Sequence, residues 1–180
     1  MEKVRLGIIG IGNMGTTHAK SIAEGKVPEM ELAAVADRKE SRRTWCKENL
    51  PENVTVFEEG KDLIASGTCD AVLVAVPHYQ HPELSIDALD HDLHVLCEKP
   101  AGVYTKQVRA MNERAKASDK VFAMMFNQRT NCVYRKMHEL VKSGELGKIK
   151  RVNWIITDWY RTQSYYDSGD WRATWDGEGG

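Results

Sequence analysis

The sequence lacks several features that would place it in a specialised class of protein. No uncharged stretch reaches the roughly 20 apolar residues of a membrane span, and the uncharged residues 71–82 include two prolines and two histidines. Lys and Arg number 25 against 26 Asp and Glu, so the basic surplus expected of a nucleic-acid-binding protein is missing. The N-terminus shows no apolar signal core, and we therefore expect a cytoplasmic protein with no membrane or nucleic-acid partner.

Cysteine is scarce, and its spacing carries no metal or redox motif. The four cysteines are Cys46, Cys69, Cys97 and Cys132. None stands in a C-x-x-C pair, so the sequence predicts no metal site and four reduced thiols. What is present is an ordinary globular composition, with 42% hydrophobic and 28% charged residues in a chain of 180. That length and composition are sufficient to bury a hydrophobic core.

Short apolar runs alternate with helical patterns through the first 126 residues. The predicted strands cover residues 4–9, 31–36, 54–57, 71–76, 94–97 and 121–126. The predicted helices cover residues 14–24, 39–50, 61–66, 82–89 and 105–117. This alternation predicts right-handed βαβ units, and continuous apolar strands are typical of a parallel sheet covered on both faces. We therefore predict an α/β fold, a Rossmann-type doubly wound parallel sheet, over residues 1–126.

The pattern changes after residue 126. Residues 132–143 predict a helix, and residues 148–159 show the partial alternation of a strand. The last 30 residues hold four of the five tryptophans and three of the six tyrosines. One helix, one strand and an aromatic tail are too few to close a core. We therefore interpret residues 127–180 as the beginning of a second domain in a truncated chain.

The segment Gly10-Ile11-Gly12-Asn13-Met14-Gly15 fits the pattern G-x-G-x-x-G. It follows a predicted strand and opens a predicted helix, as the dinucleotide-binding fingerprint requires. The first glycine permits a tight turn, the second lets the backbone approach a pyrophosphate, and the third allows close packing of helix and strand. The free N–H groups of the helix N-terminus would then meet the phosphates. We predict a dinucleotide site that includes Gly10, Gly12, Asn13, Met14 and Gly15, against the alternative of a glycine-rich turn without a ligand.

Asp37 ends the second predicted strand, 22 residues beyond Gly15. An acid at about this distance accepts hydrogen bonds from the adenosine ribose and repels a 2′-phosphate, which favours NAD over NADP. Arg38 leaves the preference open, because arginine can also bind a 2′-phosphate. We interpret Arg42 and Arg43 as solvated charges of the following helix.

Polar segments follow three further predicted strands. They are Val76-Pro77-His78-Tyr79-Gln80-His81, Glu98-Lys99-Pro100 and Asn127-Gln128-Arg129. Doubly wound sheets bind ligands beyond the carboxyl ends of their strands, so these segments are expected to converge on one crevice. Each could also be an ordinary exposed loop, and Asn127 and Arg129 could equally cap a strand. Proline after Lys99 disfavours helical backbone there, and a cis Lys99–Pro100 bond is one possibility that we consider.

Together these segments resemble the Gfo/Idh/MocA family, which includes glucose–fructose oxidoreductase and inositol dehydrogenase. The residues that carry the likeness are the Gly10–Gly15 loop, Ala36-Asp37-Arg38, Pro77 with His81, Glu98-Lys99-Pro100 and Trp171-Arg172. The resemblance implies a Rossmann domain followed by an α/β domain with an open, mostly antiparallel sheet. It also implies an enzyme that oxidises or reduces sugars, inositols or related polyols with NAD or NADP, often as a homo-oligomer.

The resemblance also implies roles for individual residues. Lys99 would be the active-site lysine, and Glu98 would lie near the nicotinamide ribose. Val76, Pro77 and His81 would neighbour the cofactor after the fourth strand. Asn127 would belong to a polar cluster at the nicotinamide, with Trp171 and Arg172 near the cofactor.

One departure from the family pattern leaves the function open. Family members usually carry an aspartate and a histidine just beyond the double glycine that corresponds to Gly179-Gly180, and this sequence stops first. A dinucleotide-binding module or sensor without catalysis is therefore the alternative to a dehydrogenase. An assembly protein that reuses the fold is a third possibility. The sequence does not identify the substrate.

Overall fold

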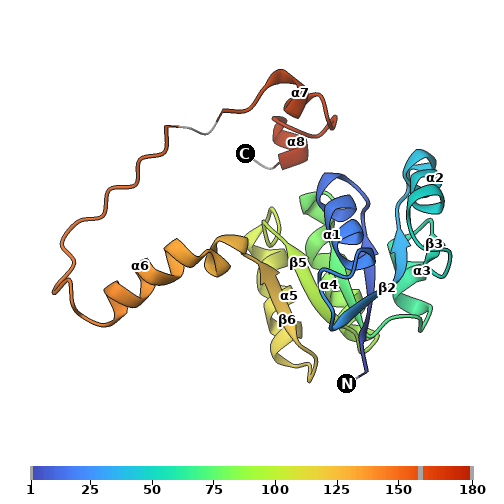
Figure 1. Cartoon of the computed structure of the whole chain (residues 1–180), viewed down its shortest axis with the longest axis horizontal. Coiled ribbons are helices and arrows are strands. Elements are labelled where there is room, and N and C mark those ends of the chain that lie inside the picture. Colours follow the sequence, from blue (N-terminus) through green and yellow to red (C-terminus); the bar gives the residue numbers. More distant parts are fainter. Residues whose placement is uncertain (1, 158–159, 179–180) are drawn as a thin grey trace.

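A computed structural model describes residues 2–157 and 160–178 of the chain. Its six strands form one parallel sheet in the order β3-β2-β1-β4-β5-β6 (Figure 1). The strands are β1 (Val4–Ile9), β2 (Met30–Ala36), β3 (Thr55–Phe57), β4 (Ala71–Val74), β5 (His94–Glu98) and β6 (Phe122–Met125). The chain builds outward from β1 in one direction and from β4 in the other, so the topological switch point lies between these two strands. The predicted Rossmann-type sheet is confirmed.

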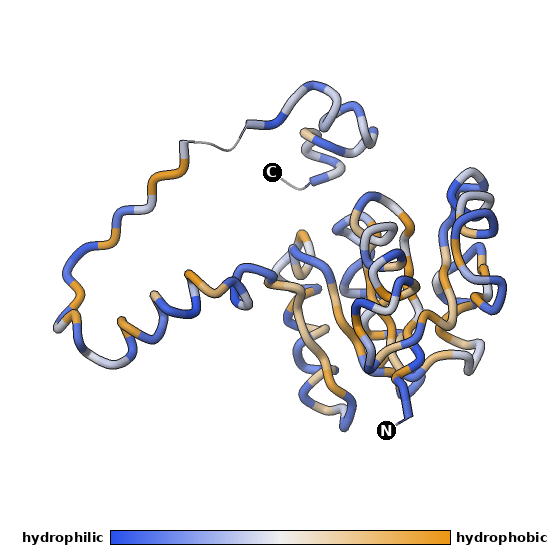
Figure 2. Tube along the Cα trace, viewed as in Figure 1, coloured by the Kyte–Doolittle hydropathy of each residue, from blue (hydrophilic) through white to orange (hydrophobic). Residues whose placement is uncertain are grey.

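Helices cover both faces of the sheet. They are α1 (Asn13–Ala23), α2 (Glu40–Asn49), α3 (Gly60–Ala65), α4 (His81–Asp90) and α5 (Thr105–Lys116), with a short 3-10 turn η1 (His78–Gln80) before α4. Apolar residues of α1 and α2 pack on one face, against a cluster that includes Ile8 and Val35. Those of α3 and α4 pack on the other face, against a cluster that includes Val72 and Val95. This two-sided burial explains why the strands read as continuous apolar runs, which appear as hydrophobic segments in Figure 2.

The fourth strand is shorter than the predicted residues 71–76. It ends at Val74, although the Ala75 N–H still donates to the Ile9 carbonyl at 2.8 Å. The Val76 carbonyl has left the sheet and contacts the His81 ring at 2.7 Å. The His81 side chain of α4 therefore replaces the neighbouring strand as the hydrogen-bond partner of the Val76 carbonyl. The chain then turns toward η1.

Beyond residue 126 the structure confirms one predicted element and contradicts another. A turn η2 (Asn127–Thr130) leads into α6 (Cys132–Lys142), whose first turn is capped by the Asn131 side chain accepting from the Val133 N–H at 2.9 Å. The strand predicted over residues 148–159 is wrong for the described part, residues 148–157, where no strand forms. A strand needs a neighbour for its backbone groups, and this segment lies far from the sheet, beyond α6 (Figure 1). Residues 158–159 lie outside the described part.

The chain then returns toward the sheet through two short helices, α7 (Gln163–Tyr166) and α8 (Trp175–Glu178). Figure 1 shows both helices beyond the carboxyl ends of the strands, on the same side as the start of α1. The aromatic tail is thereby brought to the edge of the sheet at which a doubly wound fold binds its ligands. No helix in residues 2–157 and 160–178 is long and apolar enough to span a bilayer.

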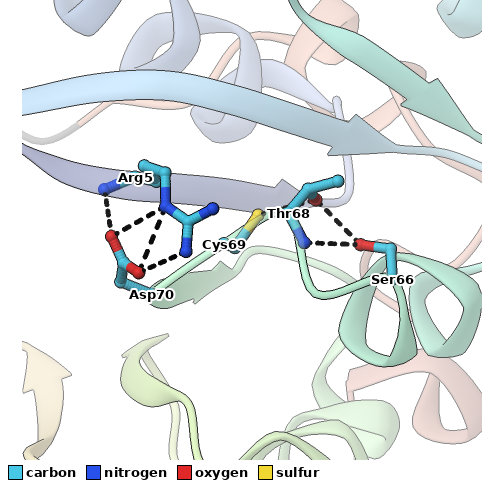
Figure 3. A network of polar contacts seen from close by, with 5 residues as sticks. All are labelled: Arg5, Ser66, Thr68, Cys69 and Asp70. Carbon is cyan, nitrogen blue, oxygen red and sulfur yellow. Dashed lines mark hydrogen bonds and ion pairs between the residues drawn. The ribbon is translucent and has the colours of Figure 1, made fainter.

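The opposite, amino edge of the sheet is closed by a polar network (Figure 3). Arg5 of β1 donates to the Asp70 carboxylate from its side chain at 2.6 Å and from its backbone N–H at 2.9 Å. Beside it, the Thr68 backbone N–H donates to the Ser66 hydroxyl at 3.3 Å. The network joins β1 to the start of β4, the two strands on either side of the switch point.

Candidate dinucleotide and substrate site

The loop between β1 and α1 has the geometry that its three glycines predict. Gly10 has a φ of +95°, and a Cβ there would lie 2.6 Å from the Ala75 carbonyl oxygen. A Cβ on Gly15 would lie 1.9 Å from the Gly10 carbonyl oxygen. A Cβ on Gly12, in contrast, would meet nothing within 4 Å. Two glycines are therefore required by the fold itself, and the third faces open space that a ligand can enter.

The N-terminus of α1 opens into that space. Its N-cap is Gly12, which has no side chain to cap the first turn, and no acidic side chain lies in that turn. The first intrahelical bond runs from the Thr16 N–H to the Gly12 carbonyl at 2.9 Å, which leaves the N–H groups of Asn13 and Met14 pointing out of the helix. Free N–H groups at the positive end of a helix dipole suit a pyrophosphate.

Asp37 lies at the end of β2, next to this loop. One carboxylate oxygen accepts from the Ile11 N–H at 2.7 Å, and the other accepts from the Lys39 N–H at 2.8 Å. The first bond fixes the carboxylate against the glycine loop. Each oxygen of a carboxylate can accept two hydrogen bonds, so both retain a lone pair for the hydroxyls of a ribose.

Two of the three arginines that follow Asp37, Arg38 and Arg43, are already paired. The Arg38 guanidinium donates to Glu59 at 2.9 Å. Arg43 donates to the backbone carbonyls of Asp37 and Arg38 at 2.9 and 2.7 Å. Our interpretation of Arg43 as a solvated helix charge is therefore wrong: its side chain is largely buried and satisfies carbonyls that the turn leaves unpaired.

The segment after β4 is held by His81, the first residue of α4. Its ring is buried, with one nitrogen 2.7 Å from the Val76 carbonyl oxygen and the other 2.7 Å from the Pro100 carbonyl oxygen. His81 thus connects the end of β4 to the segment after β5, which brings two of the predicted polar segments together. Pro77 is exposed at the rim between them.

Lys99 follows β5, and its side chain is exposed. The Lys99–Pro100 peptide bond is cis. Glu98, directly before it, is buried and contacts the His18 ring at 3.0 Å. Burial by itself would raise the pKa of the Glu98 carboxyl, but the hydrogen bond and charge of His18 and the Lys99 N–H lower it below its usual value.

His18 did not emerge from the sequence analysis. It lies on α1, three residues after the last glycine of the loop, 80 positions away from Glu98 in the chain. Its only sequence signal is a polar aromatic residue within a helix that carries the dinucleotide fingerprint. The order of the strands, which places β1 beside β4 and β4 beside β5, brings α1 to the end of β5.

The aromatic tail reaches the same edge. The Trp171 ring stands edge-on to the His78 ring, with centroids 4.9 Å apart. Arg172 lies over the rings of Trp171 and Tyr165 at 4.6 and 4.3 Å and donates to the Tyr165 hydroxyl at 2.7 Å. The structure therefore places Trp171 and Arg172 beside η1, and their place near the cofactor stays a prediction.

His78 is the titratable group at the centre of this edge. Burial lowers the pKa of its ring, and the charges of His81, Lys99 and Arg172 lower it further, while Glu178 acts in the opposite direction. Its Nδ1 atom is buried and has no hydrogen-bond partner among the described residues. The neutral form of His78 is therefore favoured, with one buried nitrogen left without a hydrogen-bond partner among the described residues.

The segment after β6 stands apart from these contacts. The Asn127 carbonyl accepts from the Thr130 hydroxyl at 2.7 Å, and the Arg129 guanidinium lies over the Phe126 ring at 5.6 Å. Both residues are exposed. These contacts are local, and both interpretations of Asn127 and Arg129, a place in the site and a strand-end cap, stay predictions.

Comparison with known proteins identifies relatives of the chain. The model of an oxidoreductase family with an NAD-binding Rossmann fold, GFO_IDH_MocA, matches residues 4–126. Myo-inositol 2-dehydrogenase of Thermotoga maritima is 33% identical over 145 residues, which cover 81% of this chain and 42% of that protein.

Solved structures give the same result. Scyllo-inositol dehydrogenase from Lactobacillus casei, with bound NAD(H) and scyllo-inositol, matches with a TM-score of 0.76 at 28% identity, over 81% of this chain and 43% of that one. The WlbA dehydrogenase from Bordetella pertussis, in complex with NADH and UDP-GlcNAcA, matches in fold over 98% of this chain and 50% of its own, with a TM-score of 0.85 at 23% identity.

The chain thus spans half or less of the length of these relatives. The family match includes the glycine loop, Asp37, the His81 contacts and the Glu98-Lys99-Pro100 segment. We conclude that this chain belongs to the Gfo/Idh/MocA family of oxidoreductases and contains its NAD-binding Rossmann fold.

Proposed function

We propose that the chain binds NAD and forms the cofactor-binding part of a dehydrogenase that acts on a hydroxyl-bearing carbon of a sugar, inositol or related polyol. The observation that carries this proposal is the uncapped N-terminus of α1 at Gly12, facing open space beside the Asp37 carboxylate. Bound there, the nicotinamide cofactor would supply the acceptor or donor of a hydride. The relatives named above as inositol dehydrogenases support the class of substrate.

The residues present fit the cofactor in three places. The N–H groups of Asn13 and Met14 would hold the pyrophosphate. The Asp37 carboxylate would accept from the adenosine ribose hydroxyls and would repel a 2′-phosphate. Arg38, the side chain that could offset this repulsion, is paired with Glu59 at 2.9 Å, which supports NAD over NADP.

Lys99 is the residue that we assign to the chemistry. Loss of a hydride from a secondary alcohol also requires loss of the hydroxyl proton, and an ammonium beside that oxygen stabilises the developing negative charge. Lys99 lies at the carboxyl edge of the sheet, close enough to His78 for its charge to lower the pKa of that ring. Seven residues are assigned to the surroundings of the cofactor: Val76, Pro77, His81, Glu98, Asn127, Trp171 and Arg172.

We further propose that residues 1–126 form the dinucleotide-binding domain and that residues 127–180 belong to a second domain with an open, mostly antiparallel sheet. The end of the family match at residue 126 supports this division. The exposed apolar residues of α6 support a partner element there, since Val133, Met137 and Val141 are not covered in the described chain. A homo-oligomer is part of the same proposal.

Titration of the 180-residue chain with NAD and with NADP tests the proposal. We expect the chain to bind NAD more tightly than NADP. Calorimetry, or energy transfer from tryptophan to the bound reduced cofactor, measures the two affinities. Asp37→Ala should narrow or reverse the preference, because the carboxylate no longer repels the 2′-phosphate. Glu52→Ala, at an exposed acid of a turn outside the site, is the matched control and should leave both affinities unchanged. Failure of the unaltered chain to bind either dinucleotide would contradict the proposal.

A further inference from the structure

The side chain of Lys99 is exposed, but the residues on either side of it are anchored. Glu98 contacts His18, and the carbonyl of Pro100 contacts His81. The two histidines belong to α1 and α4, which pack on opposite faces of the sheet. The segment that carries Lys99 is therefore held from both faces by side chains of two rigid elements.

The first anchor acts through the Glu98 carboxylate. One of its oxygens lies 3.0 Å from the His18 Nε2 atom, and the other accepts from the Lys99 backbone N–H at 3.2 Å. Glu98 is only 5% exposed, so its charge depends on these partners rather than on water. A single buried group thus couples α1, the helix that we propose to hold the pyrophosphate, to the backbone of Lys99.

The second anchor is the His81 ring, which is 1% exposed. Both of its contacts, at 2.7 Å to the carbonyl oxygens of Val76 and Pro100, are with groups that can only accept hydrogen bonds. A ring nitrogen that carries hydrogen donates to the carbonyl oxygen that it faces, and the ring lies between the two carbonyls. The ring spans the gap between the end of β4 and the residue after Lys99, and it fixes their separation.

We propose that His18 and His81 are positioning residues that set where the Lys99 ammonium stands at the carboxyl edge of the sheet. The inference rests on the proposed dehydrogenase function, in which Lys99 acts on the substrate hydroxyl. Neither histidine needs to touch the cofactor or the substrate for this role. A misplacement of about 1 Å at a reacting group lowers turnover by a factor on the order of 100, so loss of either anchor should appear in kcat.

The two nitrogens of His81 can be separated by substitution. An asparagine amide reaches about as far as Nδ1, which contacts Pro100, and a glutamine amide reaches about as far as Nε2, which contacts Val76. The test compares kcat and the affinity for NAD among these variants of the longest protein that the reading frame encodes. His81→Asn should retain most of kcat, whereas His81→Gln should lose about tenfold or more, because the segment that carries Lys99 is then free to shift. The loss in His81→Gln should fall mainly on kcat rather than on the affinity for NAD. Equal kcat values in the two variants would overturn the role of His81.

His18 allows a similar pair. His18→Leu removes the partner of Glu98, so the pKa of that carboxyl should rise and the acid limb of the pH profile of kcat should move to higher pH. His18→Gln keeps a donor and should restore the profile. His91→Leu, at a partly exposed histidine near the amino edge of the sheet, is the control and should leave the profile unchanged. An unchanged profile and kcat in His18→Leu would overturn the role of His18.

A double substitution keeps the test valid if His18→Leu folds poorly. Glu98→Gln preserves shape and removes the charge that His18 partners. If His18 acts through Glu98, the combination of His18→Leu with Glu98→Gln should lower kcat little beyond Glu98→Gln alone. Fully additive losses would contradict the inference. Absence of dinucleotide binding and turnover in the unaltered protein would instead contradict the proposed function, so the two failures are distinguishable.

Discussion

At the scale of single residues, Gly12 and Gly15 of the same loop differ in the space that a side chain would find. A Cβ at position 15 meets the Gly10 carbonyl oxygen at 1.9 Å, whereas a Cβ at position 12 meets nothing within 4 Å. Gly15→Ala should therefore destabilise the fold by about 1–3 kcal/mol or more, since backbone cannot yield as a side chain does. The gain in helix propensity, about 1 kcal/mol, is too small to offset this clash. Urea unfolding followed by circular dichroism measures the difference.

Gly12→Ala is the matched variant. It should change the free energy of unfolding by less than about 1 kcal/mol, because only an N-cap preference is lost. Dinucleotide binding should weaken by about tenfold or more, since the methyl group occupies the space through which a pyrophosphate approaches. A Gly12→Ala chain that unfolds at a clearly lower urea concentration, or that binds NAD as tightly as the unaltered chain, would show that the open space beside Gly12 has another role.

The cysteines differ in reactivity for a physical reason. Burial raises the pKa of Cys46 and of Cys97 to about 11 and also raises that of Cys69, while Cys132 is exposed. An aromatic disulfide reagent at pH 8 should therefore modify one thiol per folded chain, and Cys132→Ser should abolish that reaction. Raising the pH to 9 should not release further thiols until the chain unfolds, because the buried thiols stay protonated. Rapid labelling of the Cys132→Ser chain would contradict the burial of the other three.

At the scale of elements, α5 and α6 differ in what they pack against. Met111 is the one buried residue that α5 contributes, with 0% exposure, and Met137 of α6 is 48% exposed. Met111→Ala should cost about 2–5 kcal/mol, the usual range for a buried methionine. Met137→Ala should change stability by less than about 0.5 kcal/mol in this chain. Both variants remove the same atoms, so chemical denaturation of the two isolates the contribution of burial. Similar losses of stability in both would mean that α6 is covered in solution.

At the scale of the whole molecule, the Arg5–Asp70 pair joins the two halves of the sheet at their amino edge (Figure 3). Hydrogen bonds from the Arg5 side chain and backbone lower the pKa of the Asp70 carboxyl. A carboxyl whose pKa is lower in the folded chain than in the unfolded chain stabilises the fold. This contribution is fully present above the unfolded pKa, near 4, and it disappears as the pH falls through the folded pKa. Asp70→Asn should therefore lower the melting temperature at pH 7 and have much less effect at pH 2.5. A loss of equal size at both pH values would indicate packing rather than charge.

The fold of the first 126 residues could be predicted from the sequence because its signals are local. Each strand is a short apolar run bounded by glycine, proline or a polar turn, and each helix lies between two such runs. A sheet covered on both faces leaves no other place for runs such as Ala71–Val74. The glycine loop was predictable for the same reason, since Gly10 and Gly15 are required by backbone geometry within a few residues of each other.

Sequence patterns were therefore sufficient to predict the succession of strands and helices along the chain, the glycine loop and the family resemblance. Which side chains meet at the carboxyl edge became known from the folded structure alone. The contact between His18 and Glu98 joins residues 80 positions apart, and that between His78 and Trp171 joins the main sheet to the tail. The alternation in residues 148–157 predicted a strand that does not form, because pairing depends on a neighbouring strand. Local propensity needs only the adjacent residues, whereas a strand partner or an anchoring histidine depends on chain segments that the fold alone brings together.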